Sequence, residues 1–300
     1  MDRRLLLQAL GAMAAGAFCK AGSAQPQRVM AKKIPSTGEA LPVIGVGTWQ
    51  TFDVGADASA RAQLREVLRL LNGNVVDSSP MYGSSETVAG DLIAELGRRD
   101  KLFMATKVWT RGREPGIQQM ETSFKRLRVQ RMDLMQVHNL TDVETHTKTL
   151  LEMKSQRKIR YLGITHYTSS AYDEVERRLK TRQYDFLQIN YSLGERESEN
   201  RLLPLALDQE VAVIINRPFA EGALFRRTKN KPLPPWASEL GITSWAQYFL
   251  KWIVSHPAVT CAIPGTGNPK HMQDNLGAGA GKLPSAQQRK QMAEYFDAQG

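Results

Sequence analysis

Short apolar runs alternate with helix-like segments from about residue 43 of this chain onward. The segments between the runs repeat apolar residues at helical spacing, as Leu64, Val67, Leu68 and Leu71 do in residues 58–71. The eight apolar runs predict strands at residues 43–48, 74–77, 102–107, 132–138, 161–165, 186–190, 211–215 and 259–263. Further helices are predicted at residues 85–96, 116–127, 144–158, 243–254 and 284–296, and a long loop at the proline-rich residues 222–235.

This alternation predicts an α/β fold, a single (β/α)8 TIM barrel. Strands that alternate with helices form a parallel sheet through right-handed crossovers, and eight such units close a barrel. The alternative is an open doubly wound sheet, which normally carries a glycine-rich turn directly after its first strand. Residues 45–47 are Gly-Val-Gly, but they lie in or at the end of a predicted strand and lack the rest of that fingerprint. We therefore expect one barrel domain over residues 25–300.

Residues 1–24 have the layout of an export signal. Arg3 and Arg4 precede an apolar run at residues 5–18, and small residues follow at 22–24. The paired arginines resemble a bacterial twin-arginine signal, which exports folded proteins. The run is shorter than the roughly 20 residues that a bilayer span needs. We expect the export machinery as a partner, no stable membrane span, and a periplasmic protein that is cytoplasmic before export; Cys19 leaves a lipid-anchored start open.

The composition is that of a globular protein with a basic surface. Hydrophobic residues make up 42% and charged residues 23% of the chain, which is enough to bury a core. The formal charge is +10, but Lys and Arg are dispersed, so a solvated basic surface is favoured over a nucleic-acid partner. Removing the predicted signal leaves Cys261 as the single cysteine, so the mature domain forms no internal disulfide.

Four candidate catalytic residues lie at the ends of neighbouring predicted strands. Asp77, Lys107 and His138 end the second, third and fourth runs, and Tyr82 lies in the loop five residues after Asp77. Active sites of barrel enzymes are built at these strand ends. Each residue alone fits an ordinary structural role, as a turn former, a solvated strand end, a core histidine or loop packing. Together they can act as a proton donor, with a tyrosine, a cation and a carboxylate at the same barrel mouth.

The expected chemistry of this group is proton donation. A free tyrosine titrates near pH 10, and a neighbouring ammonium favours the phenolate, so we expect Lys107 to lower the pKa of Tyr82. Asp77 would keep Lys107 charged and oriented. His138 would hydrogen-bond the substrate oxygen or help to relay the proton.

These residues stand in motifs that resemble the aldo-keto reductase family. The match runs from about residue 41 to residue 276 and includes Gly-Val-Gly-Thr-Trp at 45–49, Asp-Ser-Ser-Pro-Met-Tyr-Gly at 77–83, Ala-Thr-Lys at 105–107 and Asp-Leu-Met-Gln-Val-His at 133–138. The resemblance implies that a nicotinamide cofactor, with no metal, supplies hydride to an aldehyde or ketone while Tyr82 protonates its oxygen. Trp49 matches a position that lines the substrate pocket, although it equally fits a residue that seals the barrel end.

The resemblance also places the cofactor along the ends of the last four strands. Gln188 and Asn190 match positions near the nicotinamide, and Asp274 and Asn275 match the adenine end. The glycine-rich residues 265–267 leave backbone N–H groups for a phosphate ahead of a short helix. The full set of matching positions is Thr165, His166, Gln188, Asn190, Asn216, Arg217, Gly265, Thr266, His271, Asp274 and Asn275.

Three of these positions depart from the family pattern. His166 stands where a small residue and an Asn are usual, and Asn216 replaces the aromatic residue that stacks on the nicotinamide. His271 stands where an Arg often holds the 2′-phosphate, and a neutral histidine holds phosphate less well than a guanidinium. Because Lys270 and Thr266 can compensate, we expect NADP(H), with NAD(H) as the alternative.

Two interpretations of function stay open. The first is a reductase of a small-molecule carbonyl compound. The second is an exported cofactor-binding or redox-sensing barrel with little turnover, which the export signal makes worth testing because free cofactor is expected to be scarce outside the cytoplasm. Arg217 likewise has two interpretations, a contact to pyrophosphate or a substrate anion, or a structural salt bridge.

Overall fold

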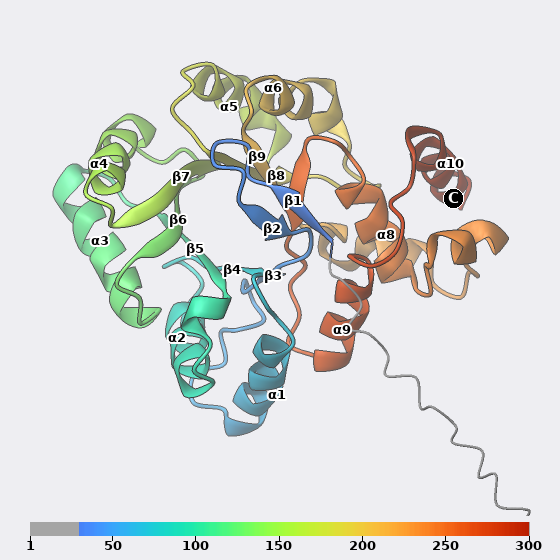
Figure 1. The fold of residues 1–300 in the computed structure, drawn as a ribbon, viewed down its shortest axis with the longest axis horizontal. Helices are drawn as coiled ribbons and strands as arrows, with labels where there is room; N and C mark the ends of the chain where they lie inside the picture. The colour runs from blue at the N-terminus through green and yellow to red at the C-terminus, as the bar shows by residue number, and fades with distance from the viewer. Residues whose placement is uncertain (1–29, 300) are drawn as a thin grey trace, which may run out of the picture.

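A β-hairpin lies across one end of the barrel. The computed structural model describes residues 30–299, so the predicted signal at residues 1–24 lies outside the described part. Strands β1 (Ala31–Lys33) and β2 (Ala40–Pro42) pair antiparallel, and Figure 1 shows them crossing in front of the ring of strands. Ile34 and Leu41 are fully buried in the same cluster as the barrel interior. The sequence pattern did not predict this hairpin, because three-residue strands are too short to show alternation.

Eight parallel strands form the barrel and are hydrogen-bonded in chain order. They are β3 (Val46–Gly47), β4 (Val75–Asp77), β5 (Phe103–Val108), β6 (Met132–His138), β7 (Ile159–Thr165), β8 (Phe186–Asn190), β9 (Ala212–Asn216) and β10 (Val259–Ala262). Parallel bridges from Ile44 to Ala262 and from Gly47 to Gly265 join the first strand to the last. The predicted barrel is therefore confirmed over the open doubly wound sheet.

Helices surround the strands, as Figure 1 shows. The α-helices are α1 (Ala58–Arg69), α2 (Ser85–Glu95), α3 (Arg113–Arg126), α4 (Val143–Ser155), α5 (Tyr172–Leu179), α6 (Leu202–Asp208), α7 (Ala223–Arg227), α8 (Trp245–Val254), α9 (Pro269–Gly277) and α10 (Ala286–Asp297). Short 3-10 helices lie at Arg99–Lys101, Ser169–Ala171, Glu197–Asn200, Ala220–Gly222 and Pro235–Leu240.

The prediction of a loop at residues 222–235 is wrong in part, because this segment contains α7, which at five residues is too short for helical periodicity. Within residues 30–299, no helix is both long and apolar enough to cross a membrane.

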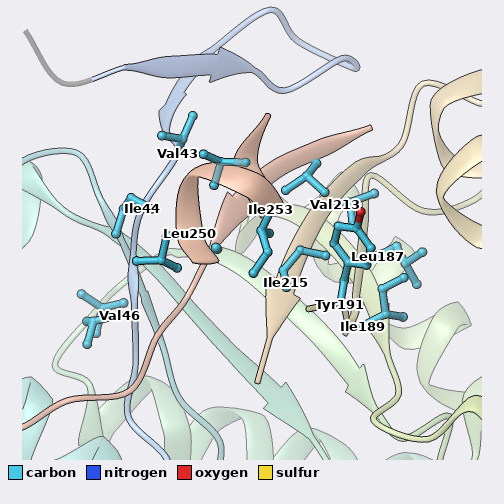
Figure 2. Packing of buried hydrophobic residues seen from close by; sticks show 14 of the residues in the cluster. Val43, Ile44, Val46, Leu187, Ile189, Tyr191, Val213, Ile215, Leu250 and Ile253 are labelled. Atoms are coloured by element: carbon cyan, nitrogen blue, oxygen red, sulfur yellow. The ribbon is translucent and has the colours of Figure 1, made fainter. Parts of the chain in front are cut away.

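The outward faces of the strands pack against the helices. Figure 2 shows Leu250 and Ile253 of α8 facing the strands, with Ile253 beside Val213 and Ile215 of β9. All four side chains are fully buried in one cluster. Burial of each such side chain contributes roughly 1.5–3 kcal/mol, so this shell holds the strand ends in fixed positions.

Candidate active site

The inward-facing positions change from apolar to polar along the central strands of the barrel, as β4 and β6 illustrate. On β4 the interior residue Val75 is followed two positions later by Asp77, and on β6 Leu134 is followed by Gln136 and then His138. Because side chains alternate along a strand, residues two apart point to the same side of the barrel wall. The polar residues therefore converge at the carboxyl-terminal mouth, where the sequence predicted the site.

A buried ion pair lies at the centre of this mouth. Lys107 Nζ lies 2.6 Å from Asp77 Oδ2 and donates to Ser78 O at 2.7 Å. The two charged residues are only 1% and 2% exposed. Burial alone would lower the pKa of Lys107, but the adjacent Asp77 carboxylate acts against it, and the net direction of the Lys107 pKa is upward. The expected pairing of Asp77 with Lys107 is thus present, and the ammonium is retained.

Two carboxamides complete the bonding of the Asp77 carboxylate. Gln136 Nε2 lies 3.2 Å from Asp77 Oδ1, and Gln188 Nε2 lies 3.1 Å from Asp77 Oδ2. Gln136 was not among the predicted site residues. Its position two residues before His138 on the same strand could have identified it, because that spacing puts both side chains inside the barrel.

Tyr82 lies beside this ion pair with its hydroxyl protonated. Lys107 Nζ is 5.1 Å from the centre of the Tyr82 ring, and the ring meets His138 edge-on at 5.9 Å between centroids. Burial raises the pKa of Tyr82; the charge of Lys107 lowers it, and Asp77 raises it further. The predicted effect of Lys107 is therefore present, but desolvation is the larger influence, so the net direction of the Tyr82 pKa is upward.

His138 is a neutral imidazole at physiological pH. Burial lowers its pKa to about 3, and the charges of Lys107 and His166 act in the same direction. Its Nδ1 lies 3.1 Å from Ser79 Oγ, which itself accepts from the backbone N–H of Met81 at 3.3 Å. When the Ser79 hydroxyl donates to Nδ1, the imidazole proton lies on Nε2, where it can be donated to a ligand.

An apolar rim surrounds the mouth. Among residues 30–299, eight large hydrophobic side chains are exposed, and half of them lie on the loops after β3, β4, β5 and β7. They are Trp49 (44% exposed), Met81 (45%), Trp109 (38%) and Tyr167 (48%). Trp109 reaches the active centre directly, since its ring lies 6.0 Å from that of His138. The predicted contact of Trp49 with substrate stays a prediction.

The other half of the mouth, at the ends of β7–β10, contains buried polar atoms without partners. Asn190 Nδ2 donates to Tyr167 O at 2.7 Å and to Glu195 Oε1 at 2.9 Å. The Oδ1 atoms of Asn190 and Asn216, however, are buried and accept no hydrogen bond from the part of the chain that the structure describes. Such acceptors fit a ligand that bears N–H donors, as the carboxamide of a nicotinamide does. The predicted cofactor residues that are buried are Thr165, Gln188, Asn190, Thr266 and Asn275.

His166 is the first residue of the loop after β7, and its imidazole accepts hydrogen bonds from the backbone of that loop. Its Nδ1 accepts from the backbone N–H groups of Tyr167 at 3.1 Å and Thr168 at 3.2 Å. Burial lowers the pKa of the imidazole. A ring whose Nδ1 accepts two amide protons carries its own proton on Nε2, so His166 presents a donor in place of the usual amide.

The predicted phosphate-binding turn precedes α9. Gly265 is exposed, and Thr266 Oγ1 accepts from the backbone N–H of Asn268 at 3.1 Å. Asn268 caps the helix by accepting from Lys270 N at 2.9 Å. His271 is exposed in the first turn of α9. The turn and the helix start are thus arranged as the sequence predicted.

Two of the predicted cofactor residues are engaged with other parts of the chain. Asp274 accepts from Ser244 Oγ and from Gln247 Nε2, each at 2.7 Å, so both of its oxygens bind the start of α8. Arg217 lies 3.1 Å from Glu221, which is the salt bridge left open as an alternative. These contacts position α8 and the loop after β9, and any contact of Asp274 or Arg217 with a cofactor stays a prediction.

Comparison with known proteins places this geometry in context. Residues 43–294 match the model of the aldo/keto reductase family. Methylglyoxal reductase YeaE of Escherichia coli K12 is 31% identical over 268 residues, which cover 85% of this chain and 92% of that protein. The NADH-specific methylglyoxal reductase of the same organism is 27% identical over 228 residues, which cover 64% of this chain and 69% of that protein.

Solved structures share the fold. The crystal structure of an aldo/keto reductase from Klebsiella pneumoniae in complex with NADP and acetate superposes with a TM-score of 0.75 at 26% identity. The superposition covers 89% of this chain and 96% of that one. The likeness extends over nearly the whole described barrel.

Proposed function

Since the chain belongs to the aldo/keto reductase family and is an NAD(P)H-dependent reductase of carbonyl compounds, we propose that Tyr82 delivers the proton that the carbonyl oxygen takes up. The observation that carries this proposal is the buried Asp77–Lys107 pair beside the Tyr82 ring. A phenol there stays protonated until it is needed, because burial raises its pKa. The ammonium then stabilises the phenolate that forms on donation.

The roles of the other three residues follow from their contacts. Asp77 keeps Lys107 charged and oriented through the 2.6 Å contact. His138, neutral because burial lowers its pKa to about 3, donates from Nε2 to the substrate oxygen and orients it for protonation. A protonated imidazole would compete with Tyr82 as the acid, and the lowered pKa of His138 prevents this at neutral pH.

The cofactor residues fit a nicotinamide. When bound, the reduced nicotinamide supplies the hydride that the carbonyl carbon accepts. The buried Oδ1 atoms of Asn190 and Asn216 would accept from its carboxamide, and Gln188, two residues before Asn190 on β8, would border the same group. Residues 265–267 and the start of α9 offer backbone N–H groups to phosphate. NADP(H) is the form we expect, and Lys270 and His271 at the start of α9 would hold its 2′-phosphate.

The substrate is a small aldehyde, with 2-oxoaldehydes as the first class to test. The relatives at 31% and 27% identity are both named for methylglyoxal reduction. The rim of Trp49, Met81 and Trp109 excludes water from a carbonyl held at His138, which strengthens its hydrogen bonds there.

The experiment follows NADPH consumption by the purified mature chain with methylglyoxal, an aromatic aldehyde, a ketone and a quinone. Turnover with methylglyoxal that falls roughly 10²-fold or more in Tyr82→Phe supports the proposal. Equal rates in the two proteins would remove Tyr82 as the acid. Tight cofactor binding with no carbonyl reduced would favour a cofactor-binding or redox-sensing barrel instead.

We further propose that residues 1–24 form a twin-arginine signal and that the protein works in the periplasm. Arg3, Arg4 and the apolar run at residues 5–18 support this proposal. Replacing both arginines by lysine is expected to retain the protein in the cytoplasm. Unchanged export of that variant would contradict the proposal.

A further inference from the structure

Three polar side chains form a closed ring of hydrogen bonds beneath the active centre. Gln136 Nε2 lies 3.2 Å from Asp77 Oδ1 and 3.0 Å from Gln188 Oε1, and Gln188 Nε2 lies 3.1 Å from Asp77 Oδ2. Gln136 is fully buried, and the other two are at most 2% exposed. They come from β4, β6 and β8, so the ring joins strands that are not neighbours in the sheet.

The chemistry of the carboxylate fixes the orientation of both amides. An ionised Asp77 can only accept, so the nitrogens of Gln136 and Gln188 must face it. The oxygen of Gln188 then turns toward Gln136, whose nitrogen supplies its second proton. The Nε2 of Gln136 thus donates to the acid and to the neighbouring amide at once, while its own Oε1 is buried without a partner among the described residues.

The fold makes room for this side chain at a specific place. Gln136 pairs in register with Gly163 on β7, and a Cβ added at Gly163 would lie 3.3 Å from Gln136 Cγ and 2.8 Å from Phe186 O. The absence of a side chain at Gly163 therefore lets the Gln136 carboxamide lie flat across the barrel interior. Any larger residue at position 163 would displace both neighbours.

We propose that Gln136 is a positioning residue that holds Asp77 and Gln188 in their working orientations at the same time. This inference rests on the proposed function, in which Asp77 orients Lys107 beside Tyr82 and Gln188 borders the nicotinamide. Through Gln136, the proton-donating centre and the nicotinamide-facing amide form one unit. Neither can rotate without breaking a buried hydrogen bond, which leaves a polar atom unpaired.

The test uses two substitutions of Gln136 and two readouts. Gln136→Leu removes both donated bonds, so kcat with methylglyoxal is expected to fall roughly 10- to 100-fold, and the Kd for NADPH, from quenching of protein fluorescence, to rise several-fold. Gln136→Glu keeps the shape. Its protonated carboxyl can donate one bond, whereas its ionised form repels Asp77, so its activity is expected to fall as pH rises, in a range where the native enzyme stays constant.

Leu134→Ala is the matched control. Leu134 lies on the same strand and the same interior face as Gln136, but in the apolar layer. It therefore forms no hydrogen bond to Asp77, Gln136 or Gln188. This variant is expected to lower the melting temperature while leaving the pH profile and the Kd for NADPH unchanged. Changes within twofold in Gln136→Leu, a native pH profile in Gln136→Glu, or equal changes in Leu134→Ala would overturn the proposal. Failure of the proposed function is recognised separately, as full activity of Tyr82→Phe.

Discussion

The two halves of the barrel mouth differ in whether the chain pairs the groups that the proposed chemistry uses. In the half formed by β4–β6, the Asp77 carboxylate receives bonds from Lys107, Gln136 and Gln188, although Oε1 of Gln136 is buried and accepts no hydrogen bond from the described residues. In the half formed by β7–β10, the buried Oδ1 atoms of Asn190 and Asn216 accept none from the described part of the chain. Unpaired buried acceptors are costly, so they persist where a ligand completes them. The proton-donating half is thus assembled in advance, and the cofactor half is completed by its ligand.

The largest expected effect comes from breaking the ion pair of the assembled half. Lys107→Met leaves Asp77 buried without its cation, which is expected to cost about 3–5 kcal/mol of stability. It also removes the ammonium beside Tyr82, so kcat is expected to fall roughly 10²- to 10⁴-fold. Thermal unfolding and steady-state kinetics measure the two effects.

Lys180→Met is the control for this substitution. Lys180 lies 2.6 Å from Glu176, the same separation as in the Asp77–Lys107 pair, but its side chain is 59% exposed. Water screens an exposed pair, so this variant is expected to keep the native melting temperature and rate. A Lys107→Met protein as stable and active as Lys180→Met would show that the buried pair does not organise the site.

The second effect is a loss of folding stability as pH falls, because His138 takes up a proton more readily in the unfolded chain than in the folded protein. In the unfolded chain this imidazole takes up a proton near its ordinary pKa of 6.5, whereas in the folded protein it does so at about 3. Between these values the unfolded chain binds more protons, so stability falls as pH falls, by roughly 2 kcal/mol from pH 6.5 to 5. Urea unfolding at a series of pH values measures this slope.

His138→Asn is expected to reduce the acid slope without abolishing it. Burial also lowers the pKa of His256, to about 4, and that residue contributes in the same direction. The exposed His271 serves as the control, because His271→Asn is expected to leave the slope as it is. An unchanged slope in His138→Asn would place the titrating group elsewhere.

A smaller effect is expected at the phosphate end of the cofactor half. His271→Arg adds a permanent, planar cation in the first turn of α9. A guanidinium forms charge-assisted bonds with phosphate, so the preference for NADPH over NADH is expected to rise about tenfold. The ratio of the two Kd values measures it, and an unchanged ratio would show that the 2′-phosphate lies away from position 271.

The smallest expected effect is at the nicotinamide end. Asn216→Ala removes one of the two unpaired oxygens, so the Kd for NADPH is expected to rise about fivefold, the loss of a single neutral hydrogen bond. The stability of the unliganded protein is expected to stay the same or to rise slightly. A Kd unchanged from the native value would mean that this oxygen does not meet the cofactor.

The sequence predicted the barrel and the acid centre because both follow strand periodicity. Alternating apolar runs marked all eight strands, and their last inward residues included Asp77, Lys107 and His138. Gln136 was missed because its role depends on Asp77 and Gln188 from two other strands. The sequence predicted that Lys107 lowers the pKa of Tyr82 but not the larger, opposite effect of desolvation, since burial is a property of the assembled barrel.

The cofactor half was harder to predict because some of its residues have competing partners in distant parts of the chain. The sequence placed Asp274 of α9 at the adenine end, and its oxygens bind Ser244 and Gln247 across 30 and 27 residues of chain. Which of two acceptable partners a polar side chain takes depends on the packing of α8 against α9, and local pattern does not encode it. Residue type at strand ends therefore identified the acid centre, whereas the partners of Asp274 depend on the assembled fold.

Hydrogen–deuterium exchange with and without NADPH tests the division of the mouth into two halves most directly. Backbone amides of β4–β6 are expected to be equally protected in both states, because these strands pair with one another in the chain alone. New protection is expected at residues 166–170, 191–196, 217–222 and 265–271, which border the unpaired atoms and the phosphate turn. A rise in protection across β4–β6 of the same size as in those loops would contradict a pre-assembled acid centre.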